Sequence, residues 1–379
     1  MDQLPRLRRL EGVKWRKHGP DVLACWVADM DLGIAPAIKD ELARAVDDMD
    51  VGYHSSVYNE LRTAFVERQQ AKFGWAVEFD RTELFDDVLQ AIEASLWWGT
   101  EPGDGVIIHS PVYPPFWAAI RSTGRLVVEQ PLRFDGQRWV FDDDALEQVR
   151  AARPTAMILC NPHNPTGRSF GRAELEDLAA LAAELDLLVI SDEIHAELLH
   201  PGAVHVPFAS VNADAAARTV TVTSASKAFN LAGLKCATAV MGHDRLRDRL
   251  AELPPHLLAN VNALGARASL AAYRTGDAWL AETVALLTRN RDHVVERLDA
   301  ELPGVLAGVP EATYLAWLDV RRFGLGETPA ATLIERAGIA FTDGLDFGDA
   351  GAGFIRLNFA TTPELLDEIL DRLVGELGR

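Results

Sequence analysis

Between about residues 100 and 240, short apolar runs bounded by turn residues alternate with stretches whose apolar residues recur at helical spacing. This alternation is typical of β-α-β units, in which a helix crosses between two parallel strands. One such crossover is residues 172–186, where four leucines fall on one stripe of a predicted helix. The pattern predicts an α/β fold with a mainly parallel sheet, whose candidate strands are residues 105–109, 125–130, 156–160, 187–192, 219–226 and 236–242.

The rest of the chain differs in pattern and indicates more than one domain. Residues 277–302 form a predicted helix that is long enough to link two domains. We expect an N-terminal segment (1–45) that packs on a small α+β domain (281–379), and a large domain (46–280) between them. The remaining candidate elements are helices at 36–48, 58–73, 256–276 and 363–377, and strands at 313–320 and 353–360.

The composition limits the partners and the compartment. The formal net charge is −19, from 37 basic and 56 acidic residues, so the surface repels phosphate backbones and anionic lipid head groups. No stretch reaches about 18 uninterrupted apolar residues, and no apolar segment of a signal peptide follows the basic N-terminus. We therefore expect a cytoplasmic protein with no nucleic-acid or membrane partner. The three cysteines show no CxxC spacing, which predicts reduced, buried thiols.

Lys227 lies in the segment TSASKAFN at the end of a candidate strand, flanked by the small hydroxylic residues Ser224 and Ser226. At this end, parallel sheets form the crevice that binds ligands. A lysine amine can attack an aldehyde when burial and neighbouring positive charge lower its pKa. The two serines can donate hydrogen bonds to a phosphate. An exposed lysine in a serine-rich turn explains this segment equally well by itself.

Asp192 ends the strongly apolar strand in LLVISDEIH. A carboxylate at the tip of a buried strand is costly unless it is paired with a cation or a metal. A protonated pyridine ring is such a cation, and its positive charge makes the ring an electron sink. The alternative is an aspartate that caps the N-terminus of a helix, which is common at strand-to-helix turns.

Three further residues stand at comparable positions. Asn164 follows a strand within CNPHNPTG, where two X-Pro steps keep the backbone extended, and its amide can donate to a ring oxygen. Tyr113 in SPVYPPF can lie flat against a planar cofactor, and Arg356 in GFIRLNF can clamp a carboxylate. The alternatives are an Asx-capped turn, a core aromatic and a surface arginine. Their order at successive strand ends favours one shared site.

These segments occur in the order found in fold-type I enzymes that use pyridoxal 5′-phosphate (PLP), the aspartate aminotransferase superfamily, which the chain resembles over essentially its whole length. The resemblance implies the PLP-dependent transferase fold, with a mainly parallel seven-stranded sheet between helices and a smaller α+β domain. It implies PLP as the cofactor, held by Lys227 as a Schiff base, with Asp192 at the pyridine nitrogen and Asn164 at the 3′-oxygen. It places Tyr113 against the ring and Arg356 on the substrate α-carboxylate.

Within this superfamily, KWRKHGPDVLACWVADMD, GYHSS, SPVYPPF, SDEIH and TYLAWLDV most resemble the branch of cystathionine β-lyases and cysteine C-S lyases. His195 in SDEIH stands where aminotransferases commonly have a tyrosine, and the resemblance places it at the cofactor. Asp29, Tyr113 and Asn164 are expected to contact the substrate. The resemblance also implies a homodimer with shared active sites, in which Tyr53 of GYH reaches the phosphate bound by the neighbouring subunit.

The predicted phosphate site departs from the usual pattern. Where the phosphate loop commonly has glycine or serine, this chain has DDVLQAIEAS. We therefore expect the backbone amides of Leu89 and Gln90, at the N-terminus of a helix, to contact the phosphate. Lys235 stands where many aminotransferases have a phosphate-binding arginine and many of these lyases have a neutral residue, so we expect it near the phosphate.

The activity that the resemblance implies is α,β-elimination from L-cystathionine or a related L-cysteine S-conjugate, which gives a thiol, pyruvate and ammonia. Lys227 would remove the Cα proton as a general base. An aminotransferase is the nearest alternative, and a regulatory protein that retains the fold is a more distant one. A lyase is distinguished by forming pyruvate without a keto-acid acceptor.

Overall fold

The computed structural model describes residues 4–53, 55–254 and 261–378. The centre of the fold is a sheet of seven strands: β2 (Thr82–Phe85), β3 (Gly105–Ile108), β4 (Leu126–Glu129), β7 (Ala156–Cys160), β8 (Leu188–Asp192), β9 (Thr219–Thr223) and β10 (Ala237–Met241). They lie in the order β2-β10-β9-β8-β7-β3-β4. The strands from β9 to β4 pair in parallel, whereas β10 pairs antiparallel with both β9 and β2. The predicted mainly parallel, seven-stranded sheet is confirmed.

All six candidate strands between residues 100 and 242 belong to this sheet, and their bounds agree closely with the prediction. β2 is the strand of this sheet that the sequence pattern does not reveal. It lies at the sheet edge, pairs with β10, and buries only Thr82 and Phe85. A short edge strand with a charged residue in its middle carries too little apolar signal to be recognised.

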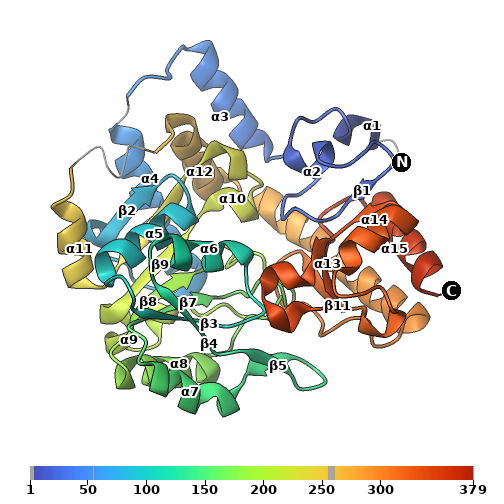
Figure 1. The fold of residues 1–379 in the computed structure, drawn as a ribbon. Coiled ribbons are helices and arrows are strands. Elements are labelled where there is room, and N and C mark those ends of the chain that lie inside the picture. Colours follow the sequence, from blue (N-terminus) through green and yellow to red (C-terminus); the bar gives the residue numbers. More distant parts are fainter. Residues whose placement is uncertain (1–3, 54, 255–260, 379) are drawn as a thin grey trace.

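Helices cover both faces of the sheet, as a mainly parallel sheet requires. On one face lie α5 (Val88–Gly99), α6 (Pro114–Ser122) and α11 (Asp244–Ala251), and on the other lie α7 (Leu146–Ala152), α8 (Arg172–Glu184) and α9 (Ala213–Arg218). The two sets of helices lie on opposite sides of the sheet (Figure 1). Apolar side chains of each set pack against the sheet in a separate buried cluster. The predicted crossover helix is α8. β7, β8 and β10 are buried along their whole length because both of their faces are covered.

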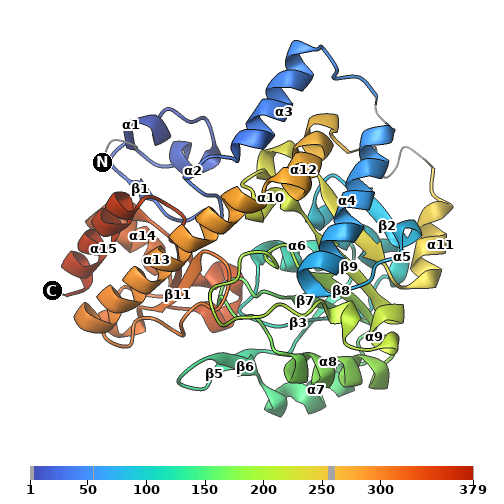
Figure 2. The same cartoon turned by 180° about the vertical axis from the view of Figure 1, so that it is seen from behind.

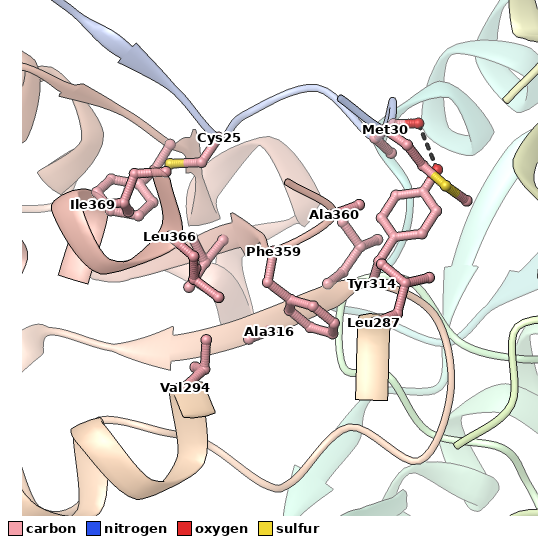
Figure 3. Close-up of a cluster of buried hydrophobic side chains, with 14 of the residues drawn as sticks. Cys25, Met30, Leu287, Val294, Tyr314, Ala316, Phe359, Ala360, Leu366 and Ile369 are labelled. Carbon is pink, nitrogen blue, oxygen red and sulfur yellow. Dashed lines mark hydrogen bonds between the residues drawn. The ribbon is translucent and has the colours of Figure 1, made fainter. Parts of the chain in front are cut away.

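The C-terminal part forms a second, smaller layer. The long helix α13 (Asp277–Glu301) leads into a three-stranded antiparallel sheet of order β11-β14-β13, with β11 (Leu315–Asp319), β14 (Phe354–Asn358) and β13 (Thr342–Asp343). Helices α14 (Pro329–Ala337) and α15 (Pro363–Leu377) flank it. Figure 3 shows the core, where Val294 of α13, Ala316 of β11 and Leu366 of α15 point toward one another.

The N-terminal segment packs against this smaller layer. Its strand β1 (Leu23–Ala24) pairs in parallel with β12 (Ile339–Ala340), and Cys25 belongs to the same buried cluster as Leu366. Figures 1 and 2 both show this segment beside α14 and α15. The domain boundaries near residues 45 and 280 stay a prediction.

Three further helices form a group of their own. The segments α3 (Pro36–Asp47), α4 (Ser56–Phe73) and α12 (Ala263–Thr275) pack together, with α12 in contact with both of the others. The predicted helix at 256–276 corresponds to α12, and its first five residues lie outside the described part of the chain. Within the described part, no helix has both the length and the apolar character needed to cross a membrane.

Candidate active site

A cleft of about 190 Å³ opens at the carboxyl ends of the central strands. Cys160 and Asp192, the last residues of β7 and β8, lie side by side in the sheet register and both line the cleft. Parallel strands end at the same edge of a sheet, so residues far apart in sequence meet there. The predicted site residues that line this cleft are Leu89, Tyr113, Asn164, Asp192, His195, Ser224, Ser226, Lys227 and Lys235.

Lys227 lies in the short helix α10 (Ala225–Ala228), which starts directly after β9. The Ser224 side chain caps this helix by accepting a hydrogen bond from the backbone N–H of Ser226 (3.1 Å). Lys227 Nζ donates to the backbone carbonyl of Ala28 at 2.8 Å. Burial is the main reason why the pKa of Lys227 is lowered, while the Asp29 carboxylate acts in the opposite direction. An exposed lysine in a turn is therefore the wrong interpretation.

Asp192 is buried, with 4% of its surface exposed, and its Oδ1 accepts a hydrogen bond from the backbone N–H of Ile194 (3.1 Å). Burial raises the pKa of this carboxyl to about 7, and Lys227 opposes the shift. The residues after Asp192 form turns, so the alternative of a helix cap does not hold. Among residues 4–53, 55–254 and 261–378 no ion pair joins Asp192 to a cation. A cationic ligand would remove the cost of burying this carboxylate.

Arg356 is also buried and is not a surface arginine. Its guanidinium donates to Asn164 Oδ1 (2.9 Å), to the Trp26 carbonyl (2.8 Å) and to Thr342 Oγ1 (3.1 Å). Its Nε lacks a hydrogen-bond partner within the described part of the chain. Burial lowers the pKa of Arg356 to about 10. The guanidinium is therefore a cation in a fixed position, and its Nε–H group can still donate a hydrogen bond to a carboxylate.

Tyr113 and His195 lie on other sides of the cleft. Tyr113 begins helix α6 and makes an edge-to-face contact with Phe116, at 5.6 Å between ring centroids. His195 is buried and contacts the ring of Tyr314 edge-on at 6.0 Å. Burial lowers the pKa of His195 to about 3, so its imidazole is neutral near pH 7. A neutral ring can approach a cofactor without adding charge.

The N-terminus of α5 also borders the cleft. It is capped by Asp87, whose Oδ1 accepts a hydrogen bond from the backbone N–H of Gln90 at 2.8 Å. Leu89 lines the cleft and Gln90 does not. Lys235 forms an ion pair with Asp87. The Ser224 hydroxyl donates its proton to the Cys236 carbonyl at 2.6 Å. In this arrangement the same proton is not donated to a phosphate. These contacts engage several of the groups that the sequence assigns to a phosphate.

Residues 26–30, here called the N-terminal strap, pass beside Lys227, and Ala28 lines the cleft. The Ala28 carbonyl accepts hydrogen bonds from Lys227 Nζ and from the Tyr314 hydroxyl, each at 2.8 Å. Figure 3 shows the Tyr314 bond as a dashed line that meets the strap next to Met30. The strap therefore supplies a backbone acceptor that orients the lysine amine.

Two asparagines also hold the strap, and no role for them follows from the sequence patterns. Asn358 Nδ2 donates to the carbonyls of Val27 (2.6 Å) and Asp29 (2.7 Å), and Asn230 Nδ2 donates to that of Met30 (3.0 Å). Asn358 is buried in β14. A polar side chain at the end of a predicted strand is a signal that could have pointed to it, since such a group needs partners when it is buried.

Four predicted site residues lie outside the cleft lining, namely Gln90, Arg356, Asp29 and Tyr53. Asp29 belongs to the strap, and its carboxylate is close enough to Lys227 to oppose the lowering of the pKa of that amine by burial. Tyr53 is fully exposed, and the neighbouring His54 of the GYH motif lies outside the described residues. Apart from Tyr53, the predicted site residues therefore lie in one region of a single chain. Gln90 is connected to the cleft by its backbone N–H, which donates to Asp87 in the cleft lining.

Comparison with known families gives one match over most of the chain. The model of the family described as aminotransferase class I and II matches residues 41–373. This range includes the central sheet, the cleft and most of the C-terminal layer.

Individual relatives match over nearly full length. The cystathionine beta-lyase PatB of Bacillus subtilis (strain 168) is 35% identical and covers 97% of both chains. A protein of Mycobacterium tuberculosis (strain ATCC 25618 / H37Rv), to which the name cystathionine beta-lyase is provisionally given, is 39% identical over 96% of this chain and 94% of its own. The crystal structure of the PLP-bound C-S lyase from Staphylococcus hominis superposes with a TM-score of 0.90 at 27% identity, over 98% of this chain and 96% of the other.

Proposed function

Since the chain belongs to the class I and II aminotransferase family, we propose that it is a PLP-dependent carbon-sulfur β-lyase. Its substrates are L-cystathionine and related L-cysteine S-conjugates, and its products are a thiol, pyruvate and ammonia. The relatives named as cystathionine beta-lyases, aligned over nearly their whole length, support this activity. The observation that carries it is that the Lys227 amine lines the same cleft as the buried Asp192 carboxylate, which forms no ion pair within the described residues.

The residues present fit PLP. Asp192 lacks a cation within the described part of the chain, and a protonated pyridine ring supplies one. Lys227 would hold the cofactor through its amine, and Asn164 and Tyr113 line the same cleft for the ring. His195, Ser224, Ser226, Lys235 and the N-terminus of α5 complete the proposed surroundings of the cofactor. When bound, PLP supplies an electrophilic carbon for amines and a cationic ring that withdraws electrons.

The side chains of the cleft have distinct tasks in the proposed reaction. Arg356, fixed by Asn164 and the strap, binds the substrate α-carboxylate through its remaining donor capacity. Lys227 takes the proton from Cα, because its lowered pKa leaves more of the amine in the basic form. The Ala28 carbonyl keeps Nζ oriented during the transfer.

These roles determine which bonds break in the proposed reaction and where the proton and the electron pair go. The Cα–H bond breaks with the proton going to Lys227, and the Cβ–S bond breaks with its electron pair leaving on sulfur. The thiolate takes up a proton, and water hydrolyses the released unsaturated amine to pyruvate and ammonia. No oxidant or second amino acid is consumed, which separates this reaction from transamination.

We also propose that two copies form a dimer with shared active sites. Tyr53 is fully exposed, and the nearby Val46, Met49 and Val51 expose 56%, 84% and 58% of their surfaces. Adjacent apolar side chains exposed in this way are typical of surfaces that bind a partner. Tyr53 would then reach the phosphate end of the neighbouring cleft. The cytoplasm is the compartment that we assign to the enzyme.

The test is pyruvate formation by the purified, PLP-loaded protein from L-cystathionine without any keto acid. We expect pyruvate from the native chain and none above background from Lys227→Ala, with an absorbance scan confirming that the native protein holds the cofactor. Bound PLP without pyruvate, but with amino-group transfer once a keto acid is added, would contradict the lyase assignment and favour an aminotransferase.

A further inference from the structure

The cap of helix α5 uses the two amides that the sequence analysis assigns to a phosphate. The Asp87 carboxylate accepts hydrogen bonds from the backbone N–H groups of both Leu89 and Gln90. These first amides carry the positive end of the helix dipole, which favours any anion placed there. Asp87 is therefore an internal anion in the position that a phosphate group would take.

Asp87 remains charged at neutral pH. Burial acts to raise the pKa of its carboxyl, but the hydrogen bonds from Lys235 and from the Gln90 amide outweigh burial and lower it. A dianionic phosphate that approaches α5 thus meets a carboxylate that does not become neutral by taking up a proton. Like charges at such short range repel each other, and burial of part of the site strengthens the repulsion.

Lys235 is the counter-charge of this carboxylate. Its Nζ forms an ion pair with Asp87 Oδ2, and both residues line the cleft. The backbone of Lys235 has a positive φ of 52°, in the turn that follows the short helix Ala232–Leu234. The amine is therefore presented from a constrained turn to Asp87.

We propose that Asp87 and Lys235 act as a charge-balanced pair that sets the affinity for the cofactor phosphate, with Lys235 acting through Asp87. In the cofactor-free protein Asp87 occupies the first amides of α5, and Lys235 neutralises it so that a phosphate can be admitted. This inference rests on the proposed use of PLP and assigns Asp87 a role in opposition to cofactor binding. Lys235 is accordingly a positioning residue for the site.

A double-mutant cycle on the full-length, cofactor-stripped chain tests the pair. The ligands are PLP and 4′-deoxypyridoxine 5′-phosphate, which lacks the aldehyde and so binds without reacting with Lys227. Affinity is measured by quenching of tryptophan fluorescence. We expect Lys235→Met to weaken binding of both ligands about tenfold, as for loss of a charged hydrogen bond in a partly exposed site.

The companion variant is Asp87→Asn, because asparagine caps a helix as well as aspartate does but carries no charge. We expect it to tighten binding about tenfold, and in the Asp87→Asn background we expect Lys235→Met to change affinity less than about threefold. Equal losses from Lys235→Met in both backgrounds would overturn the proposal and make Lys235 a direct phosphate ligand.

Two controls separate this inference from its premises. Pyridoxal, which has no phosphate, should bind all four proteins with the same affinity. The ion pair of Arg81 with Asp244, which lies outside the cleft lining, provides the matched pair Arg81→Met and Asp244→Asn, expected to leave PLP affinity unchanged. Failure of the native chain to bind PLP at all would refute the proposed function, whereas PLP binding with an additive cycle refutes only the charge-balanced pair.

Discussion

Substitution of Asp192 should change lyase activity and folding stability in opposite directions. Its carboxyl has a pKa of about 7 in the cofactor-free protein, against an ordinary value of 3.8. A carboxyl whose folded-state pKa is raised favours folding in its protonated form, so this contribution is present below pH 3.8 and is lost as the pH rises through 7. The ionised carboxylate therefore destabilises the folded chain unless a cation is bound beside it.

We expect Asp192→Asn to lower lyase activity by roughly 100-fold or more, as for loss of one partner of a buried ion pair. The same change should make the cofactor-free protein more stable at pH 8, by roughly 1–3 kcal/mol, because no charge is then buried without a partner. The two proteins should be equally stable near pH 4. Urea unfolding at both pH values, beside a pyruvate assay, checks this, and a loss of stability at pH 8 would contradict the burial argument.

Single residues were predictable where the local sequence itself carries the chemistry. Lys227, Asp192 and Asn164 follow apolar strands, so their place at the sheet edge follows from the pattern of the chain. The roles of Ala28 and Tyr314 were not predictable, since a backbone carbonyl has no sequence signature and the two residues are brought together only by folding. Side-chain identity can be read from a sequence, whereas the presentation of a carbonyl cannot.

Among the elements, helix α12 controls the turn that presents Lys235. A Cβ atom added to Gly265 of α12 would lie 2.2 Å from the Leu234 carbonyl oxygen and 3.0 Å from that of Lys235. Backbone atoms cannot yield cheaply at such distances, so the helix and the turn must separate. The glycine allows the close approach that places Lys235 in the cleft lining.

We expect Gly265→Ala to lower the free energy of unfolding by roughly 1–3 kcal/mol, as for an overpacked contact. It should also weaken PLP binding, because the Lys235 turn shifts. Gly375→Ala in α15 is the matched control, since nothing lies within 4 Å of the added Cβ atom, and alanine there should stabilise the helix by up to about 1 kcal/mol. Thermal unfolding measures the stability of both variants, and titration with PLP measures their affinity for the cofactor. Equal stability and equal affinity of the two variants would contradict the packing argument.

Elements differ in how well the sequence predicts them. The long helices α13 and α15 and the buried strands β7 and β8 agree with the prediction almost to the residue, because each carries a long run of apolar positions at one period. The strand β1 has only two residues, and its pairing with β12 joins segments more than 300 residues apart. Such a pairing depends on tertiary packing, so no local sequence pattern predicts it.

At the scale of the whole molecule, the proposed shared active sites predict subunit complementation. In a mixed dimer of Lys227→Ala and Tyr53→Ala, both defects fall in the same site, so the other site is intact. Equal amounts of the two inactive variants, unfolded and refolded together, should recover about a quarter of the native activity. Neither variant refolded alone should recover any, and an absence of recovery in the mixture would contradict shared sites.

The stability of the whole chain should fall as the solution becomes acidic. Burial lowers the pKa of His109 and His200 to about 4, and that of His163 and His195 to about 3. A base whose folded-state pKa is depressed contributes stability that is present above its ordinary pKa, 6.5 here, and is lost as the pH falls toward the folded value. Asp192 acts in the opposite direction over part of this range.

We expect each of these histidines to cost roughly 1–2 kcal/mol of folding free energy between pH 7 and pH 5. Urea unfolding of the cofactor-free protein across this range measures the total, and His200→Gln should make the dependence shallower. A free energy of unfolding that stays constant from pH 7 to pH 5 would be incompatible with four buried neutral imidazoles.

The sequence alone determined the class of fold and the main chemistry of the site, because alternating apolar runs specify a parallel sheet and because polar residues at strand ends must meet at one edge. Tertiary structure alone decided how the site is completed. It brought the Ala28 carbonyl to Lys227, buried Arg356 against Asn164 and paired Asp87 with Lys235. These contacts join segments that are distant in the chain, and they depend on packing geometry, which local sequence patterns do not encode.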